Sequence, residues 1–285
     1  RHGDDWKTES QDESTTSFLI DDGTGRWLER CGGAPWNVAR IMAQLRVPIV
    51  YLDSSKDPLN NVPTGLRAVG AALNQRERAD AYLAFYEQRR AAVQAGIDAA
   101  SHHPLVFIEA RAGRQGLDQC CYSQAETSWG KLIGQAGARN YASLLLRGAT
   151  GDIAMETLIR NKPDVYVMTG TARVRAGAHV IPFGYGATQQ RARQAMALLM
   201  NRPGFARIAR RPGDCAVGFY HQFYNSAFNI AGFEYLARAL YPQTLGQLDP
   251  DATYRRVLAT YTDIPDAPFL FETRRAFDGQ GACPP

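Results

Sequence analysis

The chain has 285 residues, of which 45% are hydrophobic and 21% are charged, and its formal net charge at pH 7 is +4. These values are typical of a soluble globular protein with room for one large or two medium domains. The charge is too small, and the lysine and arginine runs are too short, to indicate nucleic-acid binding. No stretch approaches the roughly 18 apolar residues that a transmembrane helix needs.

The first part of the chain predicts a small set of α/β elements. The polar, acidic residues 1–16 predict a poorly ordered start, and residues 17–21 predict a strand. Residues 35–45 predict a helix with Pro35 in its first turn. Residues 49–52 predict a strand, followed by a loop at residues 54–63. Open α/β sheets bind ligands at such carboxyl-terminal loops.

Residues 74–101 contain no proline and predict one long helix. Apolar side chains such as Leu83, Tyr86, Val93 and Ile97 recur at steps of three, four and seven residues, which places them on one helix face. A helix of this length spans about 40 Å at 1.5 Å per residue. We expect it to join two α/β lobes; the alternative is an ordinary surface helix of a single domain.

The second part of the chain alternates predicted strands and helices, which is typical of a second α/β lobe. Strands are predicted at residues 105–109, 164–168, 180–183 and 215–220. Helices are predicted at residues 129–136, 153–161, 187–201, 227–241 and 252–261. Polar or aromatic loops follow three of the strands, at residues 111–127, 170–177 and 220–225. We therefore predict an N-terminal lobe at residues 1–73, a helix at 74–101 and a C-terminal lobe at 102–285, with a ligand cleft between the lobes.

The five cysteines are Cys31, Cys120, Cys121, Cys215 and Cys283. Their spacing fits no zinc motif, and two adjacent cysteines are poorly arranged to hold one metal ion together. We predict no metal site. Disulfides are compatible with the sequence, but it does not assign their pairing.

Six segments, in order, resemble the substrate-binding proteins of ABC importers for siderophores, haem and vitamin B12. They are VPIVYLD (47–53), VGAALNQRERADAYLAFYEQRRAAV (69–93), GKLIGQAGARNYA (130–142), GDIAMETLIRNKPDVYVMTG (151–170), the NRPGFARI and RRPGDCAVGF run (201–219), and IAGFEYLARALYPQTLGQLD (230–249). Residues 1–46 contain no counterpart of METLIRNKPD, which the family also carries early in its first lobe, so we expect a short start to that lobe.

The resemblance implies two Rossmann-like lobes joined by one long helix, with the ligand held between them and little hinge motion. It implies a monomeric periplasmic or membrane-tethered protein that needs no cofactor, performs no catalysis and delivers a small-molecule iron chelate to an ABC importer permease. It also assigns Glu156 to permease docking, where a carboxylate meets arginines. Without the resemblance, Glu156 is an acidic residue favoured by a helix N-terminus.

The candidate ligand residues lie in loops that follow predicted strands. Arginine forks suit the carboxylate or catecholate oxygens of anionic ferric siderophores, and aromatic walls suit a large ligand. For each residue the alternative is a solvated loop arginine or an aromatic packed within its lobe. The candidates are Arg111, Arg114, Tyr122, Trp129, Arg173, Arg175, Tyr185, His221, Tyr224 and Asn225.

Other functions remain alternatives to siderophore binding. His221 or a tyrosine could ligate haem iron, and a corrinoid or an oxyanion would also fit a two-lobed cleft. A two-lobed α/β enzyme would need a convergent nucleophile, base or metal set. The GYGAT stretch at residues 184–188 lacks the serine of a nucleophile elbow. The glycine turn at residues 22–25 lacks the GK[ST] of a phosphate loop.

Overall fold

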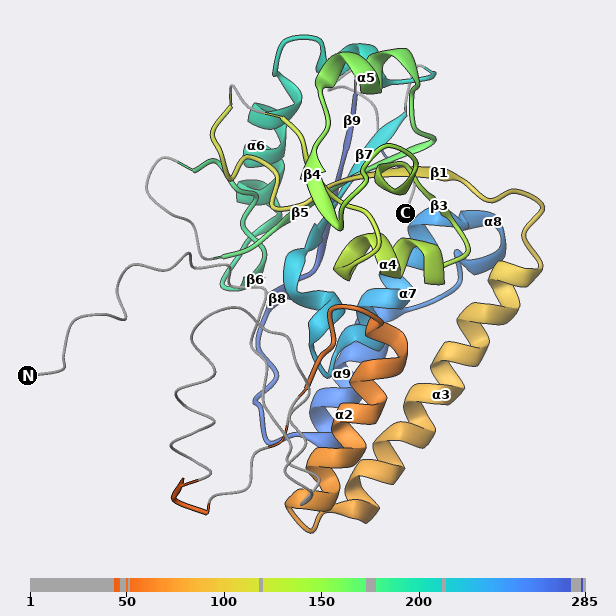
Figure 1. The fold of residues 1–285 in the computed structure, drawn as a ribbon, viewed down its shortest axis with the longest axis vertical. Helices are drawn as coiled ribbons and strands as arrows, with labels where there is room; N and C mark the ends of the chain where they lie inside the picture. Colours follow the sequence, from red (N-terminus) through yellow and green to blue (C-terminus); the bar gives the residue numbers. More distant parts are fainter. Residues whose placement is uncertain are drawn as a thin grey trace, which may run out of the picture.

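The computed structural model describes residues 44–46, 50, 52–117, 120–172, 178–211, 214–277 and 283. The predicted strand at 17–21 and nearly all of the predicted helix at 35–45 lie outside these residues. Of the predicted strand at 49–52, only Val50 and Leu52 are described, and neither is in a strand. The remaining elements alternate between helices and strands, which confirms the α/β class (Figure 1).

Five strands form the central sheet, in the order β3-β1-β5-β7-β9. The first four are mutually parallel, and β9 pairs with β7 in the antiparallel direction. The register places Val106 beside Val165 and Tyr166 beside Ala216. The strands are β1 (Leu105–Glu109), β3 (Arg139–Asn140), β5 (Val165–Gly170), β7 (Cys215–Tyr220) and β9 (Glu272–Ala276).

Helices cover both faces of the sheet, as expected for parallel strands that alternate with helices. Val106 and Ile108 of β1 belong to one core cluster, which includes residues of α3, α4, α7 and α9. Phe107, between them, belongs to the other cluster, which includes residues of α5 and α6. The helices are α3 (Arg76–Asp98), α4 (Ser128–Gln135), α5 (Met155–Arg160), α6 (Gln189–Met200), α7 (Asn229–Leu240) and α9 (Pro250–Tyr261).

The predicted loop at 54–63 is wrong from residue 58 onward, where α2 (Pro58–Ala72) begins. Pro58 fits because a proline at the first helical position loses no hydrogen bond. Pro63, inside the helix, cannot donate to the Leu59 carbonyl. Two residues of α3 approach that carbonyl instead: the Arg90 Nη1 at 3.3 Å and the Tyr86 hydroxyl at 3.5 Å. Packing between α2 and α3 thus compensates for the proline.

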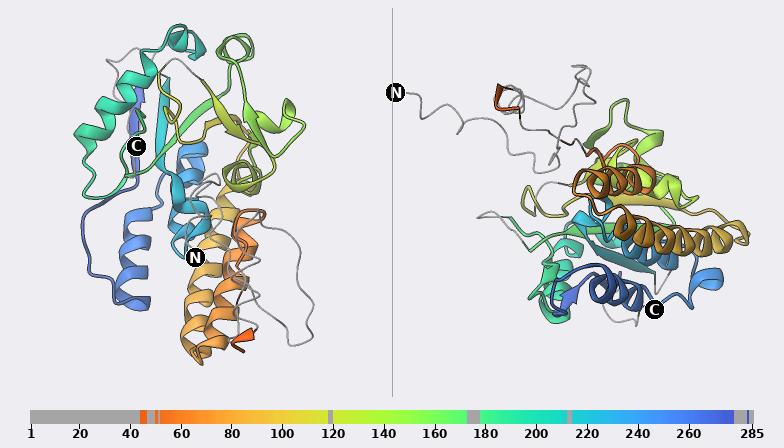
Figure 2. Two further views of the ribbon diagram at one scale, coloured as in Figure 1. Left: turned by 60° about the vertical axis from the view of Figure 1, so that its left-hand side comes forward. Right: turned by 90° about the horizontal axis from the view of Figure 1, so that it is seen from below.

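The long helix α3 confirms the helix predicted at 74–101 and measures about 35 Å at 1.5 Å per residue. Together α2 and α3 project beyond the sheet (Figure 2). Arg89 of α3 donates to buried Glu234 of α7 at 2.5 Å. A Cβ on Gly96 would lie 2.0 Å from Leu245 of α8 (Pro242–Leu245). A glycine therefore permits close contact between α3 and α8.

Several short elements were not predicted. The predicted strand at 180–183 is wrong: the pairing residues are those of β6 (Gly184–Tyr185), which forms an antiparallel ribbon with β8 (Phe269–Leu270). Strand β2 (Tyr122–Gln124), inside the loop predicted at 111–127, forms a second antiparallel ribbon with β4 (Thr150–Asp152), where no element was predicted. No helix among the described residues is long and apolar enough to cross a membrane.

Candidate functional site

Three adjacent parallel strands, β1, β5 and β7, end at one edge of the sheet, and the segments after them meet there. Thr169 of β5 connects them. Its hydroxyl accepts from the Arg111 amide at 2.8 Å and lies 2.7 Å from Nδ1 of His221. Its carbonyl accepts from the Ala112 amide at 2.9 Å. The segments carrying Arg111 and His221 are thus fixed to one residue, and we call this region the carboxyl-edge site.

The carboxyl-edge site is positively charged. The Arg114 guanidinium lies 4.3 Å from the centroid of the Tyr122 ring, a cation–π contact that holds an exposed side chain in place. Arg111 has a φ of 50°, in the left-handed region that favours glycine. Among the described residues, neither arginine forms an ion pair with a carboxylate. Both guanidinium groups are therefore available to an anionic ligand.

His221 is an internal part of this site. Its side chain is 2% exposed, and burial, followed by the charges of Arg111 and Arg114, lowers its pKa to about 3. The imidazole is therefore neutral at physiological pH. Its burial also prevents contact with haem iron in this structure, contrary to one sequence-based alternative.

Two predicted aromatic contacts are core residues instead. Trp129 is fully buried, lies 5.9 Å from Phe219 in a stacked arrangement, and donates its indole N–H to the His221 carbonyl at 2.7 Å. Tyr224 is 1% exposed and packs edge-to-face on His221 at 5.7 Å. Both therefore support the site from beneath, and neither presents a surface to a ligand.

The remaining predicted residues occupy different positions. Tyr185 is 48% exposed and its hydroxyl lies 3.0 Å from that of Tyr254. Asn225 is partly buried at the end of the 3-10 helix η3 (His221–Asn225). Glu156 is exposed in the first turn of α5, which lies at the opposite end of the sheet from β6 and β8 (Figure 1). Arg173 and Arg175 lie outside the described residues.

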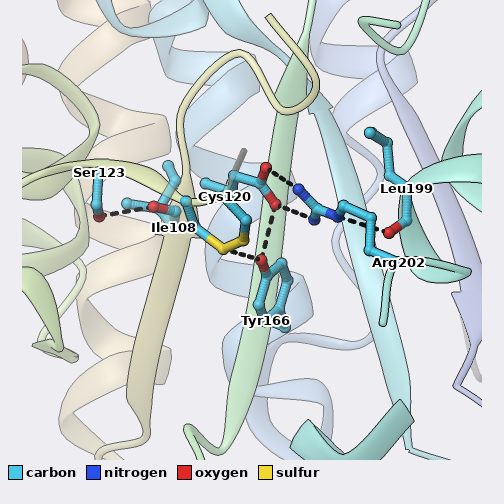
Figure 3. The surroundings of a disulfide bond; sticks show 8 residues. Ile108, Cys120, Ser123, Tyr166, Leu199 and Arg202 are labelled. Carbon is cyan, nitrogen blue, oxygen red and sulfur yellow. Dashed lines mark hydrogen bonds and ion pairs between the residues drawn. A yellow bond between two sulfur atoms is a disulfide. The ribbon is translucent and has the colours of Figure 1, made fainter. Parts of the chain in front are cut away.

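A buried polar network beneath the site was not predicted. Both oxygens of Glu109, the last residue of β1, accept from Arg202, at 2.7 and 2.6 Å. The Tyr166 hydroxyl also donates to Glu109, at 2.7 Å. Figure 3 shows Arg202 and Tyr166 converging beside the disulfide that joins Cys120 to Cys121. An acidic residue at the end of the apolar strand LVFIE indicates that its carboxylate has a buried partner. The sequence alone does not identify that partner, Arg202, which lies 93 residues further along the chain.

This network also bears on metal binding. Glu109, Cys120 and Cys121 are the one group of potential metal ligands, within the part of the chain that the structure describes, whose ligand atoms all lie within 4.8 Å of one another. The carboxylate is engaged by Arg202, and the two sulfur atoms are joined to each other. The three residues are therefore already committed to other bonds.

Of the comparisons with known proteins, the one with solved structures agrees with this architecture. No protein-family model matches the sequence, and no curated protein matches it significantly. Among solved structures, a TroA-like periplasmic binding protein, FepB from Veillonella parvula, superposes with a TM-score of 0.71 at 22% identity. The match covers 82% of this chain and 66% of that one, so the chain spans slightly less than two thirds of its length. The chain has the fold of TroA-like periplasmic binding proteins.

Two further structures with this fold are described as haem-binding proteins. A periplasmic heme-binding protein from Pseudomonas aeruginosa has a TM-score of 0.52 at 24% identity, covering 75% of this chain and 70% of that one. RhuT from Roseiflexus sp. RS-1, in its apo form, has a TM-score of 0.53 at 19% identity, covering 74% and 73%. These likenesses confirm the predicted resemblance at the level of the fold.

Proposed function

We propose that the protein is an extracytoplasmic solute-binding protein that captures a ferric siderophore at the carboxyl-edge site and delivers it to an ABC importer. The observation that carries this proposal is that Arg111 and Arg114, at the strand ends where open α/β sheets bind ligands, form no ion pair with a described carboxylate. Guanidinium forks bind carboxylate and catecholate oxygens well. The neutral His221 beneath them adds no competing charge.

An extracytoplasmic location is supported by a second disulfide. Cys215 of β7 is joined to Cys283, with the two Cα atoms 5.9 Å apart, inside the usual range for disulfides. Disulfides persist mainly in oxidising compartments such as the periplasm. The bond ties the segment after β9 to the start of the neighbouring strand β7.

Transfer to the importer requires a docking surface, and we assign it to the face that carries Glu156. The carboxylate is exposed in the first turn of α5, where it can meet an arginine of a permease. Glu156→Gln should weaken binding to the permease in detergent or nanodiscs, while binding of the chelate stays unchanged. Glu87→Gln, at an exposed position of α3, is the matched control.

The ligand is tested by titrating the purified protein with ferric hydroxamate, catecholate and carboxylate siderophores, haemin, cobalamin and molybdate, following tryptophan fluorescence. Trp129, bonded to the His221 carbonyl, places one reporter directly under the site. We expect saturable quenching by an anionic ferric siderophore and not by its iron-free form. Saturation by molybdate alone, or by none of the compounds, would contradict the proposal.

The arginines are tested in the same assay. Loss of one charge-assisted hydrogen bond costs about 1.5 to 3 kcal/mol, so Arg114→Gln should weaken binding on the order of 10- to 100-fold. Arg111→Gln should act in the same direction. Arg191→Gln, at an exposed position of α6, removes the same charge and should leave affinity unchanged. An equal loss in all three variants would mean that net charge alone matters.

Haem is the second candidate, because Tyr185 is exposed and tyrosine can ligate haem iron. The haem-binding proteins among the structural neighbours favour it as well. Haemin binding should then produce a tyrosinate-type absorption spectrum that is lost in Tyr185→Phe. A spectrum unaffected by this substitution would exclude Tyr185 as the ligand.

A further inference from the structure

A second charged cavity lies at the edge of the sheet opposite the carboxyl-edge site. It has a volume of about 810 Å³ and is bordered by the start of β1, the segment between α5 and β5, and the segment before β7. Because these strands are parallel, their amino ends share one edge, away from Arg111 and His221. We call it the amino-edge cavity; the residues that carry its charge are Arg160, Lys162, Asp164, Arg210, Arg211 and Asp214.

The two aspartates of this cavity are already engaged. One oxygen of Asp164 lies 3.3 Å from the Arg210 guanidinium, and the other accepts from the Leu105 amide at 2.7 Å. One oxygen of Asp214 accepts from the backbone amides of both Arg210 and Arg211, each at 2.8 Å. The carboxylates therefore fix the backbone and one arginine, and their capacity for further cations is reduced.

The remaining cations form no ion pair with the carboxylates of the described residues. The Lys162 ammonium donates to the Ala209 carbonyl at 2.6 Å, which is an uncharged acceptor. The side chains of Arg160 and Arg211 are exposed and form no ion pair with any described residue. Among the described residues, the cavity thus holds two exposed guanidinium groups and an ammonium that have no carboxylate within ion-pair distance.

This charge pattern has a definite ligand preference. Guanidinium groups bind phosphate oxygens in a two-pronged geometry, and lysine adds a point charge. A cavity of this size is within the range of small-molecule sites and is larger than a bare phosphate ion requires. We propose that the amino-edge cavity binds a phosphate-type anion, with room for the ester group of a phospholipid headgroup.

A headgroup as the source of the phosphate rests on the proposed function, which places the protein beside a membrane that contains an importer. Glu156 lies in the first turn of α5 and Arg160 ends the helix, so the cavity does not include the carboxylate assigned to the permease. Anionic headgroups at a membrane surface attract exposed basic residues such as Arg160 and Arg211. Headgroup binding would concentrate the protein on the membrane that contains the importer.

The test measures binding of the full chain to vesicles of phosphatidylcholine with and without phosphatidylglycerol, by flotation at low and high salt. We expect binding only to the anionic vesicles, reduced by salt. Arg160→Gln/Arg211→Gln should weaken it on the order of 30-fold, from the usual contribution of two basic residues near an anionic surface. Arg191→Gln/Arg193→Gln, at exposed positions of α6, lowers the net charge equally and should have little effect.

A second arm separates the two sources of the anion. Inorganic phosphate is added to the protein without vesicles, and the midpoint of thermal unfolding is recorded. Stabilisation of the wild-type chain, but not of Arg160→Gln/Arg211→Gln, without vesicle binding would support the phosphate site and identify a soluble ester as its ligand. If the double variant matches the wild-type chain with both probes, the proposal is wrong. Chelate titrations report separately on the proposed function, so either proposal can fail alone.

Discussion

The buried pair of Glu109 and Arg202 allows a quantitative test of the structure. Both side chains are 3% exposed, and two short hydrogen bonds join them. In Glu109→Gln, Arg202 would keep its positive charge in the core without a counter-charge. Removing one partner of a buried ion pair costs about 3 to 5 kcal/mol. We therefore expect the unfolding midpoint to fall on the order of 10 °C.

The assay is thermal and urea unfolding followed by circular dichroism, with a double-mutant cycle. Arg202→Met alone should also destabilise strongly, because among the described residues it leaves the buried Glu109 carboxylate with the Tyr166 hydroxyl as its one side-chain donor. Glu109→Leu/Arg202→Met removes both charges and should recover most of the lost stability. If Glu109→Gln unfolds within about 1 kcal/mol of the wild-type chain, the pair is not buried as described, and the reasoning is refuted.

Three further predictions concern the disulfides and His221. Replacing Cys215 and Cys283 by serine should lower the free energy of unfolding by about 4 kcal/mol, because the disulfide closes a loop of 68 residues and so restricts the unfolded chain. Urea unfolding under oxidising conditions measures this loss. Mass spectrometry after alkylation of the denatured protein should show one modified cysteine of the five without reduction, and five modified cysteines after reduction. Five modified cysteines in both samples would contradict both disulfides. The folded His221 has a pKa of about 3 against 6.5 when unfolded, so the unfolded state binds the additional proton between these values. Unfolding free energy should therefore fall as pH decreases through this window, by up to about 1.4 kcal/mol per pH unit, and the slope should be smaller in His221→Gln.

The parts of the fold that could be predicted from the sequence are those set by local patterns. Strands β1 and β7 match their predicted bounds, because apolar runs flanked by polar residues specify buried parallel strands. The end of α4 was also predictable, since Gly137 adopts the left-handed conformation expected after a helix. The edge strand β9 (Glu272–Ala276) was missed because its sequence, ETRRA, is largely charged. Its pairing with β7 decides its conformation, and that partner lies far away in the chain.

The candidate site shows the same division between local and distant information. The strands predicted from the sequence placed four candidates in the segments that follow them, and the structure brings these four residues together. They are Arg111, Arg114, Tyr122 and His221. The sequence could not distinguish a ligand-facing aromatic from a core aromatic. Trp129 packs on Phe219 and Phe223, about 90 residues further along the chain, and local patterns do not show that contact. Tyr224 packs on His221 within the same 3-10 helix.

The predicted division into a lobe at 1–73, a helix at 74–101 and a lobe at 102–285 stays a prediction. The contacts of α3 nevertheless limit how this helix could move relative to its neighbours. Arg89 is bonded to Glu234, which is fully buried, and Gly96 lies directly against Leu245. Rotation of α3 relative to α7 and α8 would separate a buried carboxylate from its counter-ion, which is costly, or force the helix backbone into a leucine. Because α2 also depends on α3 for its Leu59 carbonyl, both helices are held to α7 and α8. Ligand capture at the carboxyl-edge site should therefore involve small displacements of its loops, and not a hinge within α3.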